Sequence, residues 1–212
     1  RSVNFSREQR PGQAQAQKRP SDGTFEPRAS SKQVNQMASA REIDEVTLRR
    51  AQRGDAAACR ALVLMYQDRV VGLCARIIGR IDRSAAEDAA QETFVAVFAQ
   101  LQKFTPLGPA RLSTWMLTIA ARRAIDAQRQ LAASQRMHDE VQVRAANASA
   151  APPVSDWIAS ALAELTAEHR AVLLLSDVYE FEQREIAKAL AIEIGTVKSR
   201  LARARAAMRA SA

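Results

Sequence analysis

The polar side chains with the clearest chemistry lie near the C-terminus, in residues 183–209. In the last part of this segment, apolar residues recur at the spacing of one helical face, at Val197, Leu201, Ala204 and Met208. The other face is basic and carries hydroxyls, so it can contact phosphates and guanine acceptors in a major groove. With a helix and tight turn before it, the segment predicts a helix-turn-helix, and the alternative is a surface helix with a solvated basic face. We expect DNA contacts from Arg184, Thr196, Lys198, Ser199, Arg200 and Arg203.

A second polar set, in residues 84–104, is acidic. One face of the predicted helix is apolar and should pack on a core, while the opposite face carries Glu87 and the four residues Asp88, Gln91, Glu92 and Val95. An acidic face with an apolar centre repels DNA and suits a basic protein partner. Neighbouring carboxylates can also serve as general acid and base or bind a metal. No histidine and no second acidic cluster stands near them, so we expect a protein-binding face and no enzyme.

A third set combines an aromatic ring with guanidinium groups on the predicted helix 112–129. Stacking on rings and neutralisation of phosphates are how proteins hold unpaired nucleic acid strands. For the tryptophan, a place in the core is an equally good interpretation. The candidates for contact with unpaired DNA are Trp115, Thr118, Arg122, Arg123, Asp126 and Arg129.

Composition limits the classes of protein that these sets can belong to. Hydrophobic residues make up 47% of the 212 residues but aromatic residues only 5%, and there are just 7 glycines, which favours helices. The formal net charge of +8 favours a polyanionic partner, either nucleic acid or an acidic membrane surface, and charge alone does not separate the two. No apolar run approaches the roughly 18 residues of a membrane span, so we expect no membrane insertion and a cytoplasmic protein. Cys59 and Cys74 lack metal-ligand spacing, and we expect free thiols, no metal, no cofactor and no small-molecule substrate.

The pattern along the chain predicts an all-α protein with two small helical domains joined by a flexible linker. Residues 1–38 are rich in Gln, Arg, Ser and Pro and predict a flexible basic arm. Residues 39–131 have helical periodicity, with breaks at Gly54, around Gly79 to Ser84 and at 105–109. Residues 132–155 have the composition of a linker, and 156–212 form the second helical domain.

The second domain resembles region 4 of the extracytoplasmic-function sigma factors of the sigma-70 family. The resemblance runs from Leu162 to Arg209 and is densest in the string GTVKSRL at 195–201. It implies a helix-turn-helix that binds the minus-35 promoter element, with recognition contacts at Lys198, Ser199 and Arg203. The family often has glycine where Glu180 and Ala191 stand, and alanine fits such a turn if its backbone avoids positive φ.

The first domain resembles region 2 of the same family, a helical bundle. The string AEDAAQETF at 86–94 is similar to region 2.2, which binds the β′ clamp helices of RNA polymerase, and this implies core-polymerase contacts at Asp88, Gln91 and Glu92. Residues 112–129 are similar to regions 2.3 and 2.4, which recognise and melt the minus-10 element. Family members commonly have asparagine where Arg122 stands, and a loop equivalent to 105–113 captures a flipped base.

The resemblance implies a non-enzymatic transcription initiation factor. Its partners would be core RNA polymerase, through the β′ clamp helices and the β subunit, promoter DNA, and an anti-sigma factor that can hold it at the membrane. The alternative is an autonomous helix-turn-helix regulator, which would bind duplex DNA as a dimer and read a palindrome. Such a regulator needs a dimerisation helix or a ligand-binding domain, and the sequence indicates neither.

Overall fold

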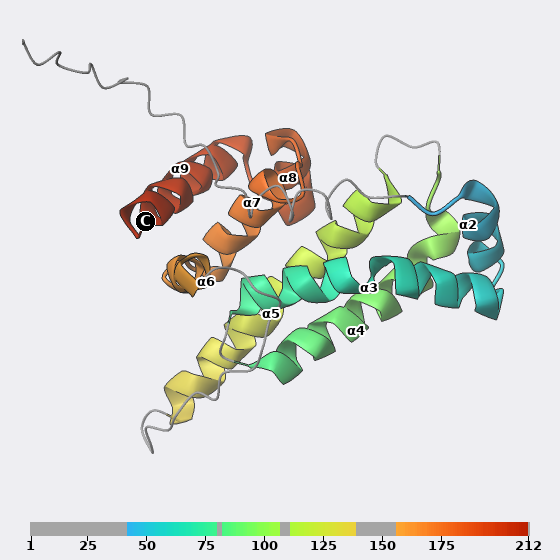
Figure 1. The fold of residues 1–212 in the computed structure, drawn as a ribbon, viewed down its shortest axis with the longest axis horizontal. Coiled ribbons are helices and arrows are strands. Elements are labelled where there is room, and N and C mark those ends of the chain that lie inside the picture. The colour runs from blue at the N-terminus through green and yellow to red at the C-terminus, as the bar shows by residue number, and fades with distance from the viewer. Residues whose placement is uncertain (1–41, 80–81, 107–110, 139–155, 212) are drawn as a thin grey trace, which may run out of the picture.

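The computed structural model of the chain describes residues 42–79, 82–106, 111–138 and 156–211. Within these ranges every regular element is a helix and no strand is present, so the predicted all-α class is confirmed (Figure 1). The predicted N-terminal arm, 1–38, lies outside the described residues, and so does most of the predicted linker, from 139 to 155. Helix α5 continues to His138, past the position at which the linker was expected to begin.

The first helical unit begins each of its early helices on an aspartate. The carboxylates of Asp44, Asp55 and Asp82 each accept a hydrogen bond from a backbone amide of the first turn, at 2.9, 2.9 and 3.2 Å. Gly54 and Gly79, with φ of 84° and 88°, let the chain turn after α2 and α3. The helices of this unit are α2 (Glu45–Gln52), α3 (Ala56–Ile78), α4 (Arg83–Gln100), the 3-10 turn η1 (Leu101–Lys103) and α5 (Leu112–His138).

Helices α3, α4 and α5 pack against one another, and α2 packs on α3. Their shared core contains fully buried Leu62, Leu73, Ile77, Val97 and Met116. Burying a side chain of this kind stabilises the fold by about 1.5–3 kcal/mol, which outweighs the weak helix preference of the β-branched residues among them. Packing between helices therefore holds this unit together.

A buried polar network ties the start of the described chain to this core. The Tyr66 hydroxyl donates to Glu42 Oε2 at 2.9 Å and accepts from the amide of Ile43 at 3.1 Å. The Ser113 hydroxyl, in the first turn of α5, also donates to the Glu42 carboxylate. Burial raises the pKa of Tyr66 above its ordinary value. The sequence contained no signal for this network, because its members are far apart in the chain.

The second helical unit contains the predicted helix-turn-helix. Its elements are α6 (Asp156–Ala163), α7 (Ala167–Asp177), α8 (Gln183–Leu190) and α9 (Ile194–Ala210). Of the predicted inward stripe on α9, Val197, Leu201 and Ala204 are buried and Met208 is half-buried. The sequence therefore identified the face by which α9 packs on α7 and α8.

The turn between α8 and α9 differs from the expectation. Ala191 was expected to avoid positive φ, but it adopts φ 52° and ψ 46°, the left-handed conformation. The reason is the hydrogen bonding that ends α8, because the amide of Ile192 turns back to the carbonyl of Ala187 at 3.0 Å. A residue with a Cβ pays about 1–2 kcal/mol for this conformation, and the packing of α8 and α9 offsets it. Glu180, with φ 58°, does the same before α8.

The two helical units pack against each other. Figure 1 shows α7 and α8 beside α3 and α5, with α9 on the far side of α7 and α8. The buried residues of both units form one continuous apolar cluster, which runs from Leu62 and Met116 to Val172 and Ile186. Contact between the units can therefore cover part of a predicted functional face.

Candidate nucleic-acid and protein interfaces

The outward side of α9 is basic and open. Lys198, Ser199 and Arg203 are exposed, and Thr196 and Arg200 are half-buried beside them. Neither Lys198 nor Arg203 forms an ion pair or a side-chain hydrogen bond with any residue that the structure describes. The Ser199 hydroxyl donates to the carbonyl of Thr196 at 3.0 Å. Side chains without internal partners can approach phosphates and base edges, as a recognition helix requires.

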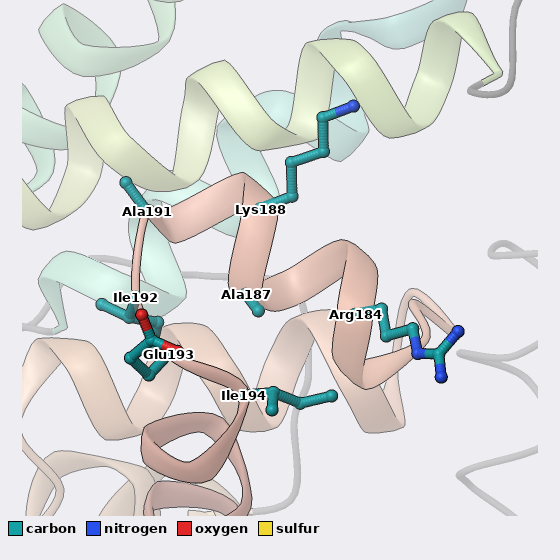
Figure 2. Close-up of a pocket in the computed structure, with 7 residues that line it drawn as sticks. All are labelled: Arg184, Ala187, Lys188, Ala191, Ile192, Glu193 and Ile194. Atoms are coloured by element: carbon teal, nitrogen blue, oxygen red, sulfur yellow. The ribbon is translucent and has the colours of Figure 1, made fainter.

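A shallow groove of about 480 Å³ lies between α8 and the start of α9. Figure 2 shows that Arg184 and Lys188 extend from α8 away from the turn, while Ile194 extends from the start of α9. Ala187, Ala191 and Ile192 line the groove with small or aliphatic side chains. Arg184, the α8 residue of the predicted DNA set, thus lines the same groove as Ile194 at the start of α9.

The basic residues of α9 divide into two groups with different surroundings. Arg205 points to α7, where it donates to Asp177 at 2.6 Å, and this hydrogen bond raises the pKa of Arg205. Burial, followed by the positive charges of Arg200 and Arg203, lowers the pKa of His169. Arg200 and Arg203 therefore place positive charge near His169 of α7.

The acidic set lies on α4 as the sequence predicts. Glu87, Asp88, Gln91 and Glu92 are exposed, and Val95 among them is 70% exposed. The apolar side of the same helix packs inward through Ala90 and Val97. Glu87 pairs with Arg83 of its own helix at 2.7 Å, and Glu92 lies 3.6 Å from Arg123 of α5, which leaves Asp88 as the acid of this set without an ion-pair partner among the described residues. This face has the exposure and charge that a basic protein partner needs.

Trp115 lies between the two interpretations that the sequence allowed. The side chain is half-buried, and its ring packs on Phe104 with centroids 5.2 Å apart and planes tilted by 34°. Gln52 holds that turn by donating to the carbonyls of Leu101 and Phe104 at 2.9 and 2.7 Å. Part of the expected base-capturing loop, 107–110, lies outside the described residues.

The structure separates the remaining α5 candidates. Arg122 donates to the carbonyls of Ala189 and Lys188 at the end of α8. Arg129 donates to Glu168 of α7 at 2.9 Å and lies 3.6 Å from Asp126. Arg122, Asp126 and Arg129 line a cleft whose other side belongs to the second helical unit.

Two other α5 candidates have partners within the first unit. Arg123 lies 3.6 Å from Glu92, so it joins the α5 set to the acidic set on α4. The Thr118 hydroxyl donates to the carbonyl of Thr114 in its own helix at 2.9 Å. The neighbouring arginines 122 and 123 thus point to different units of the molecule.

Several residues at the contact between the units escaped the sequence analysis. The Tyr179 hydroxyl donates to the carbonyl of Arg69 at 3.2 Å. Arg170 is only 4% exposed, its guanidinium lies against Gly79, and burial lowers its pKa. A sequence signal for Arg170 did exist, because it is the one charged residue on the buried, apolar side of α7. The pattern alone could not say that this side meets another domain.

The described residues show no metal site and no membrane-spanning helix. Cys59 and Cys74 are free thiols, and burial raises the pKa of Cys74 to about 12. In the part of the chain that the structure describes, no three His, Cys, Asp or Glu side chains gather as a metal site would require. None of the described helices has the length and hydropathy needed to cross a membrane.

Comparison with known proteins matches both helical units. The family model described as Sigma-70 region 2 matches residues 62–134, and that described as Sigma-70, region 4 matches residues 155–208. The chain is 28% identical to the ECF RNA polymerase sigma factor SigW of Bacillus subtilis, over 76% of this chain and 92% of SigW. It is 34% identical to the ECF RNA polymerase sigma factor SigL of Mycobacterium tuberculosis, over 70% of this chain and 87% of SigL.

A solved structure, that of CnrH in complex with the cytosolic domain of CnrY, is similar to the whole arrangement. It matches with a TM-score of 0.54 and 26% identity, over 79% of this chain and 95% of the other. The similarity thus extends across both helical units.

Proposed function

We propose which surfaces of this chain bind RNA polymerase and promoter DNA. The chain belongs to the extracytoplasmic-function group of the sigma-70 family and is a transcription initiation factor that directs RNA polymerase. The observation that carries the proposal is that one chain has two exposed surfaces of opposite charge. The acidic face on α4 surrounds exposed Val95, and on the basic face of α9 Lys198 and Arg203 form no ion pair with any residue that the structure describes. One surface suits a basic protein and the other suits DNA, as a factor that joins polymerase to a promoter requires.

The α4 face is our proposed site for core RNA polymerase. Asp88, Gln91 and Glu92 would pair with basic and polar groups of the β′ clamp helices, and Val95 would fill an apolar contact at the centre. Polar groups around a desolvated apolar centre are typical of stable protein interfaces. The β subunit is a further proposed partner, which the sequence resemblance implies for the second unit.

The α9 face is our proposed site for the minus-35 element. Lys198, Ser199 and Arg203 would enter the major groove, while Arg184, Thr196 and Arg200 would contact the DNA backbone near them. Bidentate contacts from basic side chains to guanine give about 1–3 kcal/mol of base discrimination each. The exposure of these side chains supports this assignment.

The α5 face is our proposed site for the minus-10 element, through Trp115, Thr118, Arg122, Arg123, Asp126 and Arg129. A half-buried tryptophan and arginines on the same helix support it, because rings stack on unpaired bases and guanidinium groups bind phosphates. Binding energy from the other two faces would hold the complex while this face traps the unpaired strand.

Sigma factors are non-enzymatic initiation factors, and we assign no catalytic role to the acids of α4. We also propose an anti-sigma partner, as the complex of CnrH with the cytosolic domain of CnrY suggests for this chain's similar arrangement. A factor that works on RNA polymerase would act in the cytoplasm, and an anti-sigma factor could hold it at the membrane. The autonomous regulator is not favoured, because region 2 accounts for residues 62–134.

The test of the proposed function is transcription by purified core polymerase on a promoter library, with and without the chain. We expect initiation from a defined subset of promoters only when the chain is present. A chain that neither binds core polymerase nor changes promoter choice would contradict the proposal. Binding of the chain alone to a palindromic duplex would favour the autonomous regulator.

The proposed polymerase face has its own prediction. Reversal of two charges, Asp88→Lys with Glu92→Lys, should weaken binding to core polymerase by about thirtyfold, because like charges would then meet. The measurement is a titration of labelled chain with core enzyme. The matched control reverses two exposed charges elsewhere on the same unit, Glu45→Lys with Asp68→Lys, and should change affinity less than threefold. Equal effects of the two pairs would show that the surface is misplaced.

A further inference from the structure

The contact between the two helical units covers the α5 face through a specific set of polar bonds. The Arg122 guanidinium donates through Nε to the carbonyl of Ala189 and through Nη2 to that of Lys188, the latter at 3.1 Å. These are among the last carbonyls of α8, which carry partial negative charge, and that of Lys188 also accepts from the amide of Ala191 at 3.4 Å. A cation that donates to two of them caps the helix. Arg122 of the first unit therefore completes an element of the second.

A second charged link, from Arg129, lies about two helical turns beyond Arg122 along α5. Arg129 donates through two nitrogens to Glu168 Oε1, at 2.9 and 3.1 Å. Burial by itself would raise the pKa of Glu168, but hydrogen bonds from its own amide and from Arg129 outweigh it and hold that pKa below its ordinary value. The Glu168 side chain is 24% exposed and the Arg129 side chain 60%. This pair adds a direction to the contact, and the exposure of Arg129 limits its contribution to stability.

Apolar packing and a third polar link make the contact more than a pair of surface bonds. The buried cluster runs without a break from the first unit to Ala171 and Leu174 of α7. The Tyr179 hydroxyl reaches the carbonyl of Arg69 on α3, and burial raises the pKa of this tyrosine. The contact therefore involves α3 as well as α5, and it removes apolar surface of both units from water.

Arg122, Asp126 and Arg129 line a cleft of about 310 Å³ whose other wall is made by the second unit. Leu190 and Ile192 from the end of α8 and the turn after it stand on that wall. With its Nε and Nη2 donors on α8, Arg122 cannot at the same time donate through them to a DNA strand. Lys198, Ser199 and Arg203 of α9, in contrast, are exposed in the same molecule, whereas half-buried Arg200 lines the cleft.

We propose that in the free chain the second unit docks on the α5 face, and that Arg122 is the latch that holds it there. Three of the six residues proposed for minus-10 DNA, Arg122, Asp126 and Arg129, then face the second unit until the two units separate. Lys198, Ser199 and Arg203 of the face proposed for the minus-35 element stay accessible. The docking and the latch stand on the contacts alone. That the covered face is a DNA-binding face rests on the proposed function.

The test is Förster transfer within the full-length chain, free in solution. Dyes are attached through unnatural amino acids at exposed Gln100 of α4 and Ala206 of α9, so that Cys59 and Cys74 stay unmodified. We expect one dominant high-transfer population. The change Arg122→Ala should raise the ratio of separated to docked molecules by about tenfold or more, because two charge-assisted hydrogen bonds are lost.

The matched control is Arg123→Ala, which removes the same charge from the next position of α5. Arg123 pairs with Glu92 inside the first unit, so the ratio should change less than twofold. The second variant, Glu168→Gln, lies outside the proposed DNA face and should raise the ratio about twofold to fivefold by removing an ion pair. Equal effects of the changes at 122 and 123, or a wild-type chain without a dominant high-transfer population, would overturn the docking proposal.

Promoter-directed transcription, measured on the same wild-type chain, separates this proposal from the proposed function. A chain that docks in the manner expected but does not direct initiation contradicts the function and supports the docking. A chain that directs initiation but shows no docked population supports the function and overturns the docking.

Discussion

The faces of α5 and α9 carry the same kinds of side chain but stand in opposite situations. On α9, Lys198 and Arg203 have no ion-pair partners among the described residues and point to solvent. On α5, Arg122 and Arg129 are bonded to α8 and α7. On residue type alone, both faces are predicted to bind nucleic acid. The difference teaches that a basic face is available to DNA only if the rest of the chain leaves it free.

The physical cause of the difference is where negative charge lies in the fold. The end of α8 presents carbonyls with partial negative charge, and α7 presents Glu168, and both lie beside α5. Lys198 and Arg203 of α9 have no ion-pair partner among the residues that the structure describes, and Asp177 of α7 pairs instead with Arg205 of the same helix. The same net charge is therefore neutralised internally on one face and left for a partner on the other.

The largest expected effect comes from removing charge on the open face. The double change Lys198→Ala with Arg203→Ala should lower the affinity of the holoenzyme for duplex minus-35 DNA by about a hundredfold, or about 2.8 kcal/mol. Each lost side chain would contact DNA directly and has no internal bond to give up. The measurement is a binding titration of holoenzyme against duplex promoter DNA at constant salt.

Two controls make this result a test of the comparison between the faces. Arg205→Ala removes a charge from α9 on the side that pairs with Asp177, and affinity should fall less than threefold. The pair Arg122→Ala with Arg129→Ala removes two charges from α5 and should leave binding to duplex minus-35 DNA within about threefold of wild type. If the α5 pair weakened duplex binding as much as the α9 pair, the two faces would not differ as the structure indicates.

A smaller effect is expected from crowding the contact between the units at Gly79. A Cβ at this position would lie 2.3 Å from Arg170 Nη1, and φ is 88°. Because Arg170 is buried and has little room to move, Gly79→Ala should lower the free energy of unfolding by about 2–3 kcal/mol. Urea denaturation followed by circular dichroism measures this change.

The matched control is Gly54→Ala, which has nearly the same φ, 84°, and open space around the added Cβ. It should cost only the strain of positive φ, about 1 kcal/mol. Gly79 also has ψ −170°, a conformation adopted almost only by glycine, so the extra cost at Gly79 combines this backbone strain with the contact with Arg170. Equal costs would mean that the packing under Gly79 yields easily, and that the docked side is looser than the structure indicates.

The smallest effect is a gain in stability at the turn of the helix-turn-helix. Ala191→Gly should raise the free energy of unfolding by about 0.5–1 kcal/mol, because glycine adopts the left-handed conformation without a Cβ penalty. The same chemical change one turn earlier, Ala187→Gly within α8, should lower it by about 1 kcal/mol. Opposite signs in denaturant titrations would confirm the strain, and a loss of stability in both variants would contradict it.

Much of the fold could be predicted because its signals are local. The apolar spacing at Val197, Leu201 and Ala204 identified the packed side of α9, and it needs only the periodicity of one helix. The breaks at Gly54 and Gly79 were identified from residue type, since both positions have positive φ. Exposure of Val95 followed from the acids around it.

The errors and omissions concern properties that depend on distant partners. Ala191 was expected to avoid positive φ, but the hydrogen bonds that close α8 impose it. Trp115 was undecided until its contact with Phe104 placed it half in the core. The link from Tyr179 to Arg69 had no readable signal, because its two members belong to different helical units. The charge of Arg170 on the apolar side of α7 was a signal, but it did not say that this side meets the other unit.

By itself the sequence determined the helices, the inward side of each, the family resemblance and the residue types of the three faces. These depend on interactions between residues a few positions apart, which periodicity and motif spacing record. Only the tertiary structure decided that Arg122 and Arg129 bond the second unit whereas Lys198 and Arg203 face solvent. The partner of a long, charged side chain depends on which distant carbonyl or carboxylate packing brings within about 3 Å, and residue type does not contain that distance.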